Sequence, residues 1–301
     1  MAWFEGFESG LHPAGEVELC ARVGGNPAGP AVLLLHGYPQ THVMWHRVAQ
    51  RLAADYRLVI PDLRGYGDST RPRAADSGDH AQQSKRTMAA DLAVLMTGLG
   101  HDRFAVVGHD RGGRVGHRLA LDHADRVDRL AVIDIAPTLD MYDATGMQFA
   151  RHYYHWFFLI QPSPLPERMI GGDAPFYLRW TLGGWGSHGL DFIEPEALAE
   201  YERCFCRADA IHAACEDYRA AATIDLEHDR ASRAAGEKVA CDMLVLWGKR
   251  GIVERLFDPM ALWRAQCAGS VEGEAMAAGH FIPEELPDET APRLGAFLRG
   301  R

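Results

Sequence analysis

The residues most able to do chemistry centre on Asp110, which lies in the glycine-flanked stretch Gly108–Gly112, with the sequence GHDRG. The apolar run 104–107 before it predicts a buried strand, and residues 114–121 after it predict a helix. A strand, a G-x-nucleophile-x-G turn and a helix form the nucleophile-elbow pattern. As a bare pattern this is more often an ordinary strand-to-helix turn, so Asp110 needs partners elsewhere in the chain. With them, its carboxylate would attack an electrophilic carbon and form an ester, because it is ionised at neutral pH.

Hydrolysis of such an ester requires a water and a general base, and His280 is our candidate for that base. It follows the last predicted strand, which is where the base stands in chain order behind an elbow. The imidazole needs a carboxylate to fix its tautomer, and we assign this role to Asp134, an acid between two isoleucines. Glu254 and Asp258 are alternatives, and Asp134 could instead cap the turn that follows it.

Two arginines follow the candidate nucleophile within one helical turn. Arg111 and Arg114 are spaced i, i+3, so they share a face at the start of the predicted helix. Two guanidiniums there would clamp a carboxylate bidentately, with help from the helix dipole. The structural alternative is pairing with protein acids such as Asp62 or Asp122. An arginine beside the nucleophile suits an anionic substrate, so the sequence favours a carboxylate next to the carbon under attack.

Further donors could serve the two anions that this reaction creates. The backbone N–H groups of Tyr38 and Arg111 are expected to hold the oxyanion formed during ester hydrolysis. His155, Trp156 and Tyr218 could donate to a leaving anion, although such side chains are equally common as packing residues. Fluoride is a poor leaving group and would need this help most.

The elements that must position these residues alternate between buried strands and helices, which predicts a mainly parallel sheet with helices on both faces. Ligands in such folds lie beyond the carboxyl ends of the strands. Tyr38, Asp110, Asp134 and His280 all follow strands and should therefore meet at one edge. Buried strands are expected at 31–35, 57–60, 104–107, 130–133 and 243–247. A short strand is expected at 271–276, and a half-buried antiparallel edge strand at 16–23. Helices are expected at 42–54, 84–98, 258–267 and 286–298.

The stretch from about 141 to 229 differs from the rest, because it is rich in aromatic residues, prolines and helical spacing and shows no strand-like run. It is expected to form a cap over the active edge of the sheet. Within it, Pro162–Pro166 is interpreted as a rigid turn between cap helices. Residues 70–79 are polar and predict a loop.

The composition and net charge of the chain exclude several classes of function. Hydrophobic residues make up 47% of the chain and charged residues 24%, as in ordinary globular proteins. The net charge of −10 argues against a nucleic-acid surface. The chain has neither a signal-peptide pattern nor an apolar run of membrane-spanning length, so we expect no membrane partner and a cytoplasmic location.

The six cysteines are expected to be reduced and packed rather than paired. Cys204 and Cys206, with His212 and Cys215 nearby, invite a zinc interpretation. The favoured interpretation is one helix, Ala197–Ala222, with the thiols at its apolar positions, because structural zinc sites prefer C-x₂₋₄-C spacing.

Taken together, the motifs resemble those of the fluoroacetate (haloacetate) dehalogenases of the α/β-hydrolase family. The similar segments are His36–Trp45, Asp62–Gly67, Gly108–Arg114, Val132–Ile135, His155-Trp156, Pro162–Glu167, Cys215–Arg219 and Gly279–Phe281.

This resemblance implies an α/β-hydrolase fold, with a mostly parallel eight-stranded sheet, helices on both faces and a helical cap inserted after the sixth strand. The core would comprise 1–138 and 230–301, and the cap 139–229. The resemblance implies no cofactor, no metal and a homodimer. The roles it implies are Asp110 as nucleophile, His280 as base, Asp134 as its acid, Arg111 and Arg114 as carboxylate clamp, His155, Trp156 and Tyr218 as halide pocket, and Trp185 lining the substrate cavity.

The expected activity is hydrolytic dehalogenation of a short 2-haloacid, with fluoroacetate as the best guess, through an aspartyl ester. An epoxide hydrolase is the nearest alternative, since it shares the nucleophile and base and would use cap tyrosines as acids. Arg111 and Arg114 count against that alternative. They also count against a haloalkane dehalogenase, and the full set of catalytic residues counts against a non-catalytic binding module on the same fold. The available tyrosines are Tyr153, Tyr154, Tyr177 and Tyr218.

Overall fold

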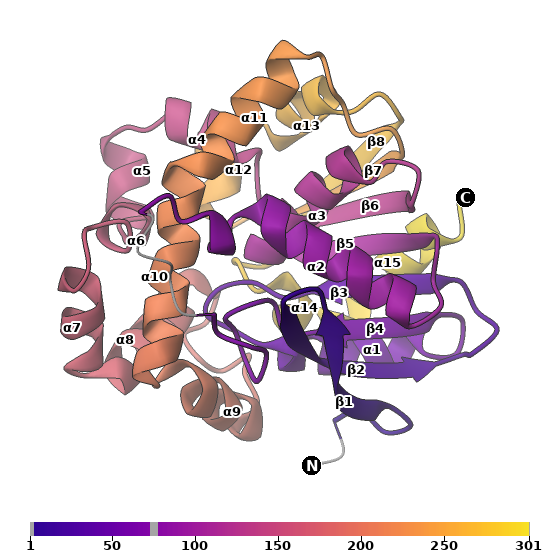
Figure 1. The fold of residues 1–301 in the computed structure, drawn as a ribbon, viewed down its shortest axis with the longest axis horizontal. Coiled ribbons are helices and arrows are strands. Elements are labelled where there is room, and N and C mark those ends of the chain that lie inside the picture. Colours follow the sequence, from indigo (N-terminus) through magenta and orange to yellow (C-terminus); the bar gives the residue numbers. More distant parts are fainter. Residues whose placement is uncertain (1–2, 73–77, 301) are drawn as a thin grey trace.

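The structure, a computed structural model, describes residues 3–72 and 78–300. Within them, eight strands form one sheet in the order β1-β2-β4-β3-β5-β6-β7-β8 (Figure 1). The β1–β2 and β2–β4 pairs are antiparallel, and all other neighbouring pairs are parallel. The predicted α/β-hydrolase architecture is therefore confirmed. The strands are β1 (Glu8–Ala14), β2 (Val17–Gly25), β3 (Ala31–Leu35), β4 (Arg57–Pro61), β5 (Phe104–His109), β6 (Val127–Ile133), β7 (Asp242–Gly248) and β8 (Val271–Met276).

The central strands are rich in apolar residues because helices cover both faces of the sheet. Every residue of β3 and β5 is buried. Helices α2 and α3 pack together over one face, and α1 and α15 pack together over the other (Figure 1). The helices outside the cap are η1 (His42–Trp45), α1 (His46–Leu52), η2 (Ala81–Gln83), α2 (Lys85–Gly98), α3 (Arg111–Asp122), α12 (Ile252–Leu256), α13 (Pro259–Gln266), α14 (Ile282–Glu285) and α15 (Pro287–Leu298).

The expectation that residues 16–23 form an edge strand is wrong. This segment, as β2, lies between β1 and β4, and the edge is β1. Most of β1 is exposed or half-buried and it contains Pro13, which an edge strand tolerates. Because β1 buries so little, its sequence lacks the apolar pattern by which strands are recognised.

The segment between β6 and β7 is helical and lies over the carboxyl ends of the strands (Figure 1). The long helix α10 (Ala208–Ala222) runs next to the core, and the cap helices between residues 147 and 185 lie on its far side. The cap helices are α4 (Thr138–Asp143), α5 (Met147–His152), α6 (His155–Phe158), α7 (Leu165–Gly171), α8 (Ala174–Trp185), α9 (Pro195–Phe205), α10 (Ala208–Ala222) and α11 (Ile224–Ala234).

One helix over Ala197–Ala222 was expected, and this prediction is wrong. Helix α9 ends before Cys206, and Arg207 has extended backbone with φ −90° and ψ 140°, so α10 begins as a separate helix. Of the predicted loop 70–79, residues 73–77 lie outside the described residues. None of the helices in 3–72 and 78–300 is long and apolar enough to span a membrane.

Candidate active site

Asp110 lies at the junction between β5 and α3, in a strained backbone conformation with φ 45° and ψ −117°. Positive φ is costly for a residue with a side chain and is typical of functional sites. The flanking glycines are required by close packing, because a Cβ on Gly108 would lie only 2.4 Å from the carbonyl oxygen of Gly112. The turn therefore has the elbow geometry that the sequence predicts.

The Asp110 carboxylate is buried but well supported. Its Oδ2 accepts a hydrogen bond of 3.0 Å from the backbone N–H of Tyr38. The turn carrying Tyr38 can approach this closely because Gly37 has no side chain. A Cβ at this position would lie only 2.6 Å from the Asp110 Cβ. The backbone N–H of Arg111, the other predicted oxyanion donor, starts α3 beside this carboxylate, and none of the hydrogen bonds in the described structure joins the two.

The electrostatic surroundings favour the ionised form of Asp110. Burial by itself raises the pKa of this carboxyl group. The positive charges of His280, Arg114 and Arg111 outweigh burial, so the pKa of Asp110 lies below its ordinary value. The side chain is therefore a carboxylate at neutral pH, as a nucleophile must be.

His280 and Asp134 form a hydrogen-bonded pair. His280 Nδ1 lies 2.6 Å from Asp134 Oδ2, and Asp134 Oδ1 accepts from the backbone N–H of Gly248 at 2.8 Å. A carboxylate at Nδ1 places the ring proton there and leaves Nε2 as the basic nitrogen. His280 Nε2 is buried and has no hydrogen-bond partner within the described residues, so it is available to a water.

Asp134 raises the basicity of this imidazole. Burial lowers the pKa of His280, but the hydrogen bond and charge of Asp134 outweigh it, and the net pKa is raised above 6.5. The two alternative acids are engaged elsewhere. Glu254 accepts from the indole N–H of Trp247, and Asp258 caps α13 through the backbone N–H of Ala261 at 2.9 Å.

His109, inside the elbow motif, helps to position His280, and no role was predicted for it from the sequence. Its Nε2 donates to the backbone carbonyl of His280 at 2.8 Å, and the two rings lie 4.5 Å apart. Burial, with the charge of His280, lowers the pKa of His109 to about 3, so it is neutral. Its position next to Asp110 in the motif was the only available signal.

Arg111 is held by an acid that the sequence analysis did not identify. Its Nε and Nη2 donate to the carboxylate of Asp217, on cap helix α10, at 2.9 and 2.6 Å. The same carboxylate binds Lys85 and accepts the hydroxyl of Tyr66 at 2.7 Å. One edge of the guanidinium is thus occupied, so Arg111 cannot present that edge to a substrate. Only its Nη1 remains, buried and without a hydrogen-bond partner among the described residues.

Arg114 is held by neutral groups instead. Its Nη1 donates to the carbonyl of Ala136 at 3.1 Å and to Thr138 Oγ1 at 2.9 Å, and its Nη2 contacts the sulfur of Met141. The guanidinium carbon lies 4.7 Å from the ring centre of Trp156. Arg114 Nε is buried and has no hydrogen-bond partner in the described structure. Beside Asp110 each arginine therefore keeps one buried guanidinium nitrogen, Arg111 Nη1 and Arg114 Nε, without a hydrogen-bond partner among the described residues.

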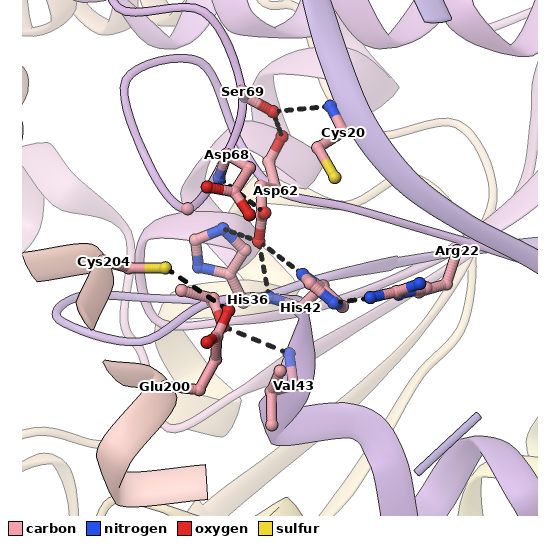
Figure 2. Close-up of polar contacts among 12 residues, drawn as sticks. Cys20, Arg22, His36, His42, Val43, Asp62, Asp68, Ser69, Glu200 and Cys204 are labelled. Carbon is pink, nitrogen blue, oxygen red and sulfur yellow. Dashed lines mark hydrogen bonds and ion pairs between the residues drawn. The ribbon is translucent and has the colours of Figure 1, made fainter. Parts of the chain in front are cut away.

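Asp62 and Asp122, considered as partners for these arginines, bind other groups. Asp122 pairs with Arg86 and Arg118. Figure 2 shows that Asp62 binds His42, through both the backbone N–H and Nδ1 at 2.8 Å.

Hydrogen bonds around Asp62, made by His42 and its neighbours, support the turn that carries Tyr38. His42 Nε2 accepts from Arg22, so its proton lies on Nδ1 and is donated to Asp62 (Figure 2). His36 Nε2 accepts the backbone N–H of Leu63 at 3.0 Å. Buried histidines thereby tie both ends of the 36–42 turn to the loop after β4.

Aromatic residues of the cap close the site. The rings of His155 and Tyr218 lie 5.5 Å apart, and Tyr38 packs against both. Burial holds the pKa of His155 well below 6.5, so it is a neutral donor, and its Nδ1 has no hydrogen-bond partner among the described residues. Trp185 contacts His155 and His280, with ring centres 4.3 and 5.6 Å away. The ring face of Trp156 lies against the guanidinium of Arg114.

The cysteines take no part in this site. All six are free thiols, and Cys204 and Cys215 are buried. No group of three or more potential metal ligands occurs among the described residues.

Comparison with known proteins places the chain in a family. Residues 30–285 match the family model described as the alpha/beta hydrolase fold, and the chain belongs to this family. It is 47% identical to a fluoroacetate dehalogenase from Burkholderia sp over 98% of this chain and 95% of that protein. It is 33% identical to a soluble epoxide hydrolase from Corynebacterium sp. (strain C12), over 90% and 92% of the two chains.

A solved structure agrees with this assignment. The crystal structure of a provisionally assigned alpha/beta hydrolase from Nostoc sp PCC 7120 is similar, with a TM-score of 0.94 and 50% sequence identity. The similarity covers 98% of this chain and 99% of that one.

Proposed function

We propose that this protein hydrolyses the carbon–halogen bond of short 2-haloacids, and that fluoroacetate, converted to glycolate and fluoride, is its substrate. The observation that carries this proposal is the pair of buried, unpartnered N–H groups, Arg111 Nη1 and Arg114 Nε, beside the ionised Asp110. A carboxylate that accepts from both would bring its own Cα to the nucleophile. The 47% identity to a fluoroacetate dehalogenase supports the same substrate.

In the first step, Asp110 attacks Cα in line with the carbon–halogen bond. A bond forms between a carboxylate oxygen and Cα, and the halide leaves with the bonding electrons. His155, Trp156 and Tyr218 donate hydrogen bonds to that halide, and Trp185 closes the cavity around the substrate. Each donor contributes about 1.5–3 kcal/mol as a charged hydrogen bond.

In the second step, His280 takes a proton from a water that attacks the carboxyl carbon of Asp110. Asp134 stabilises the imidazolium, and the backbone N–H groups of Tyr38 and Arg111 receive the oxyanion. Collapse breaks the bond between the carboxyl carbon and the ester oxygen, and His280 returns its proton to the departing hydroxyacid. Since Cα is attacked only once, a chiral substrate is inverted.

Epoxide hydrolysis is the second candidate, because two phenols flank the nucleophile. Burial, reinforced by the charge of Asp110, raises the pKa values of Tyr153 and Tyr218, so both are protonated and able to act as acids. The relative from Corynebacterium sp. supports this alternative. The free N–H groups of Arg111 and Arg114 favour the haloacid, because a neutral epoxide would leave both unpaired.

One experiment separates the two reactions. Halide release from fluoroacetate and chloroacetate is measured beside diol formation from a styrene-type epoxide, for the wild type and for Asp110→Asn. Halide release that the substitution abolishes supports the proposal. Diol formation without halide release would overturn it in favour of epoxide hydrolysis, and binding without turnover of either would indicate a non-catalytic module.

We also propose that the chain works as a homodimer in the cytoplasm, where its six free thiols would remain reduced. The cap presents four apolar side chains on the helices α7 and α8, Leu165, Met169, Phe176 and Trp180, which are 50–63% exposed. Exposed apolar patches often mark protein interfaces. Light scattering after size exclusion should give a dimer for the wild type and a monomer for the double variant Met169→Glu, Trp180→Glu.

A further inference from the structure

A cavity of about 490 Å³ lies between the cap and the carboxyl ends of β6, β7 and β8. Asp134 and His280 line its buried end, and Trp185 lines it from the cap. Three exposed cations, Lys249, Arg250 and Arg255, lie on the loop and helix after β7 and line its open end. The cavity thus connects a basic surface to the catalytic pair.

The acids around this cavity are bound to groups other than its three cations. The Glu285 carboxylate accepts the backbone N–H groups of Ser187, Gly279 and Phe281, each at 3.0 Å. Asp134 binds His280 and a backbone N–H, and Glu254 accepts the indole N–H of Trp247. Among residues 3–72 and 78–300, no ion pair joins Lys249, Arg250 or Arg255 to a carboxylate.

The two guanidiniums are instead positioned by neutral acceptors. Arg250 Nη1 lies 2.9 Å from Nε2 of His188, a cap residue, and this ring nitrogen must accept because a guanidinium can only donate. Arg255 Nη2 donates to the backbone carbonyl of Arg250 at 3.1 Å. The side chains are therefore held at the mouth of the cavity while their positive charge remains available to a ligand.

The positive charge at the open end of the cavity could attract an anionic substrate. The chain carries a net charge of −10, so its overall field repels an anionic substrate. We propose that Lys249, Arg250 and Arg255 form an outer binding site for small carboxylates, through which the haloacid enters and the hydroxyacid leaves. This inference rests on the proposed function, since only an anionic substrate needs such a site.

Trp185 marks the inner boundary of this outer site. Its side chain lines the cavity. Its ring also contacts the ring of His155, and its ring centre lies 6.2 Å from that of Tyr38. Arg111 and Arg114 are not among the residues that line this cavity, so in this proposal a carboxylate must pass Trp185 to reach them. The outer site thus raises the local concentration of substrate and does not take part in bond breaking.

The test uses three triple variants and the ionic-strength dependence of haloacetate turnover. The neutral variant is Lys249→Gln, Arg250→Gln, Arg255→Gln, and the charge-preserving variant is Lys249→Arg, Arg250→Lys, Arg255→Lys. The control, Arg57→Gln, Lys238→Gln, Arg264→Gln, removes the same charge near the amino ends of β4 and β7 and the end of α13, at the opposite edge of the sheet.

For the neutral variant we expect kcat/KM to fall about tenfold at low ionic strength and to lose most of its dependence on salt, because screening acts over roughly 8 Å at physiological salt. We expect kcat not to fall, and the charge-preserving and control variants to behave like the wild type. Equal kcat/KM in the neutral and control variants, or equal losses in the neutral and charge-preserving variants, would overturn the outer site alone. A wild type that releases no halide would overturn the proposed function, and the outer site with it.

Discussion

Asp217 of the cap accepts two hydrogen bonds from the guanidinium of Arg111, beside the candidate nucleophile, and both side chains are almost completely buried. Burial opposes ionisation of this carboxyl, but the positive charges of Arg111 and Lys85 outweigh it and hold the pKa of Asp217 below its ordinary value. The charge of Arg111 is thus already balanced before substrate binds. In the proposed function, Arg111 therefore contributes an oriented donor, and Arg114, whose hydrogen bonds within the described structure go to neutral groups, contributes positive charge.

Asp217→Asn should damage both stability and substrate binding. An amide cannot balance two buried cations, and breaking a buried pair of this kind costs about 3–5 kcal/mol of unfolding free energy. Release of the Arg111 side chain should raise KM about tenfold with a smaller effect on kcat. Urea unfolding and steady-state halide release measure the two effects. Asp229→Asn is the control, since its partner Arg118 lies away from the site. Equal KM effects in both variants would contradict a positioning role.

Arg114→Gln should weaken haloacid binding more than any other substitution on α3. It removes the charge that a substrate carboxylate would pair with, and a charged hydrogen bond of about 1.5–3 kcal/mol corresponds to a rise in KM of roughly 10–150-fold. Arg118→Gln, one turn further along the helix, is the matched control because Arg118 faces Asp229 and Ser232. The clamp role fails if Arg114→Gln binds the haloacid as well as the control does.

Ester hydrolysis should slow on the acid side, because His280 acts as a base only when neutral. Since Asp134 holds the pKa of His280 above 6.5, the rate should fall as the pH drops through that raised value. Below it, the Asp110 ester should accumulate and be detectable by mass spectrometry of the peptide. Asp134→Asn should move this limb to lower pH and slow hydrolysis on the order of a thousandfold. A limb that stays in place in the variant would contradict the pairing.

Features of the fold and the site that depend on neighbouring residues could be predicted from the sequence, and features that depend on distant residues could not. The elbow at Asp110 is encoded within five residues, so its strained turn and the strands around it could be predicted. The partnership of Arg111 with Asp217 spans 106 positions and depends on how α10 docks on the core, which no local pattern records. The neutral supports of Arg114 include a backbone carbonyl, which is invisible in sequence. The edge strand β1 was missed because it buries few side chains.

Isotope labelling should reveal the aspartyl ester directly. In a single turnover in H₂¹⁸O with enzyme in excess, the new hydroxyl oxygen of the product comes from Asp110, so glycolate should be unlabelled. The solvent oxygen should appear in the Asp110 carboxyl, because water attacks that carbon. Mass spectrometry of product and peptide measures both. Label in the first-turnover glycolate would instead indicate direct attack of water on Cα.

Tyr218→Phe should affect fluoroacetate more than chloroacetate. Tyr218 packs against His155 and Tyr38 and remains protonated, since burial and the charge of Asp110 raise its pKa. Loss of its hydroxyl removes one donor to the leaving halide and nothing else from the packing. Fluoride depends most on such donors, so the first step with fluoroacetate should slow about 10- to 100-fold, and that with chloroacetate severalfold less. Tyr177→Phe, whose hydroxyl bonds that of Tyr38 at 3.1 Å, is the control. Equal losses for both halides would remove Tyr218 from the halide pocket.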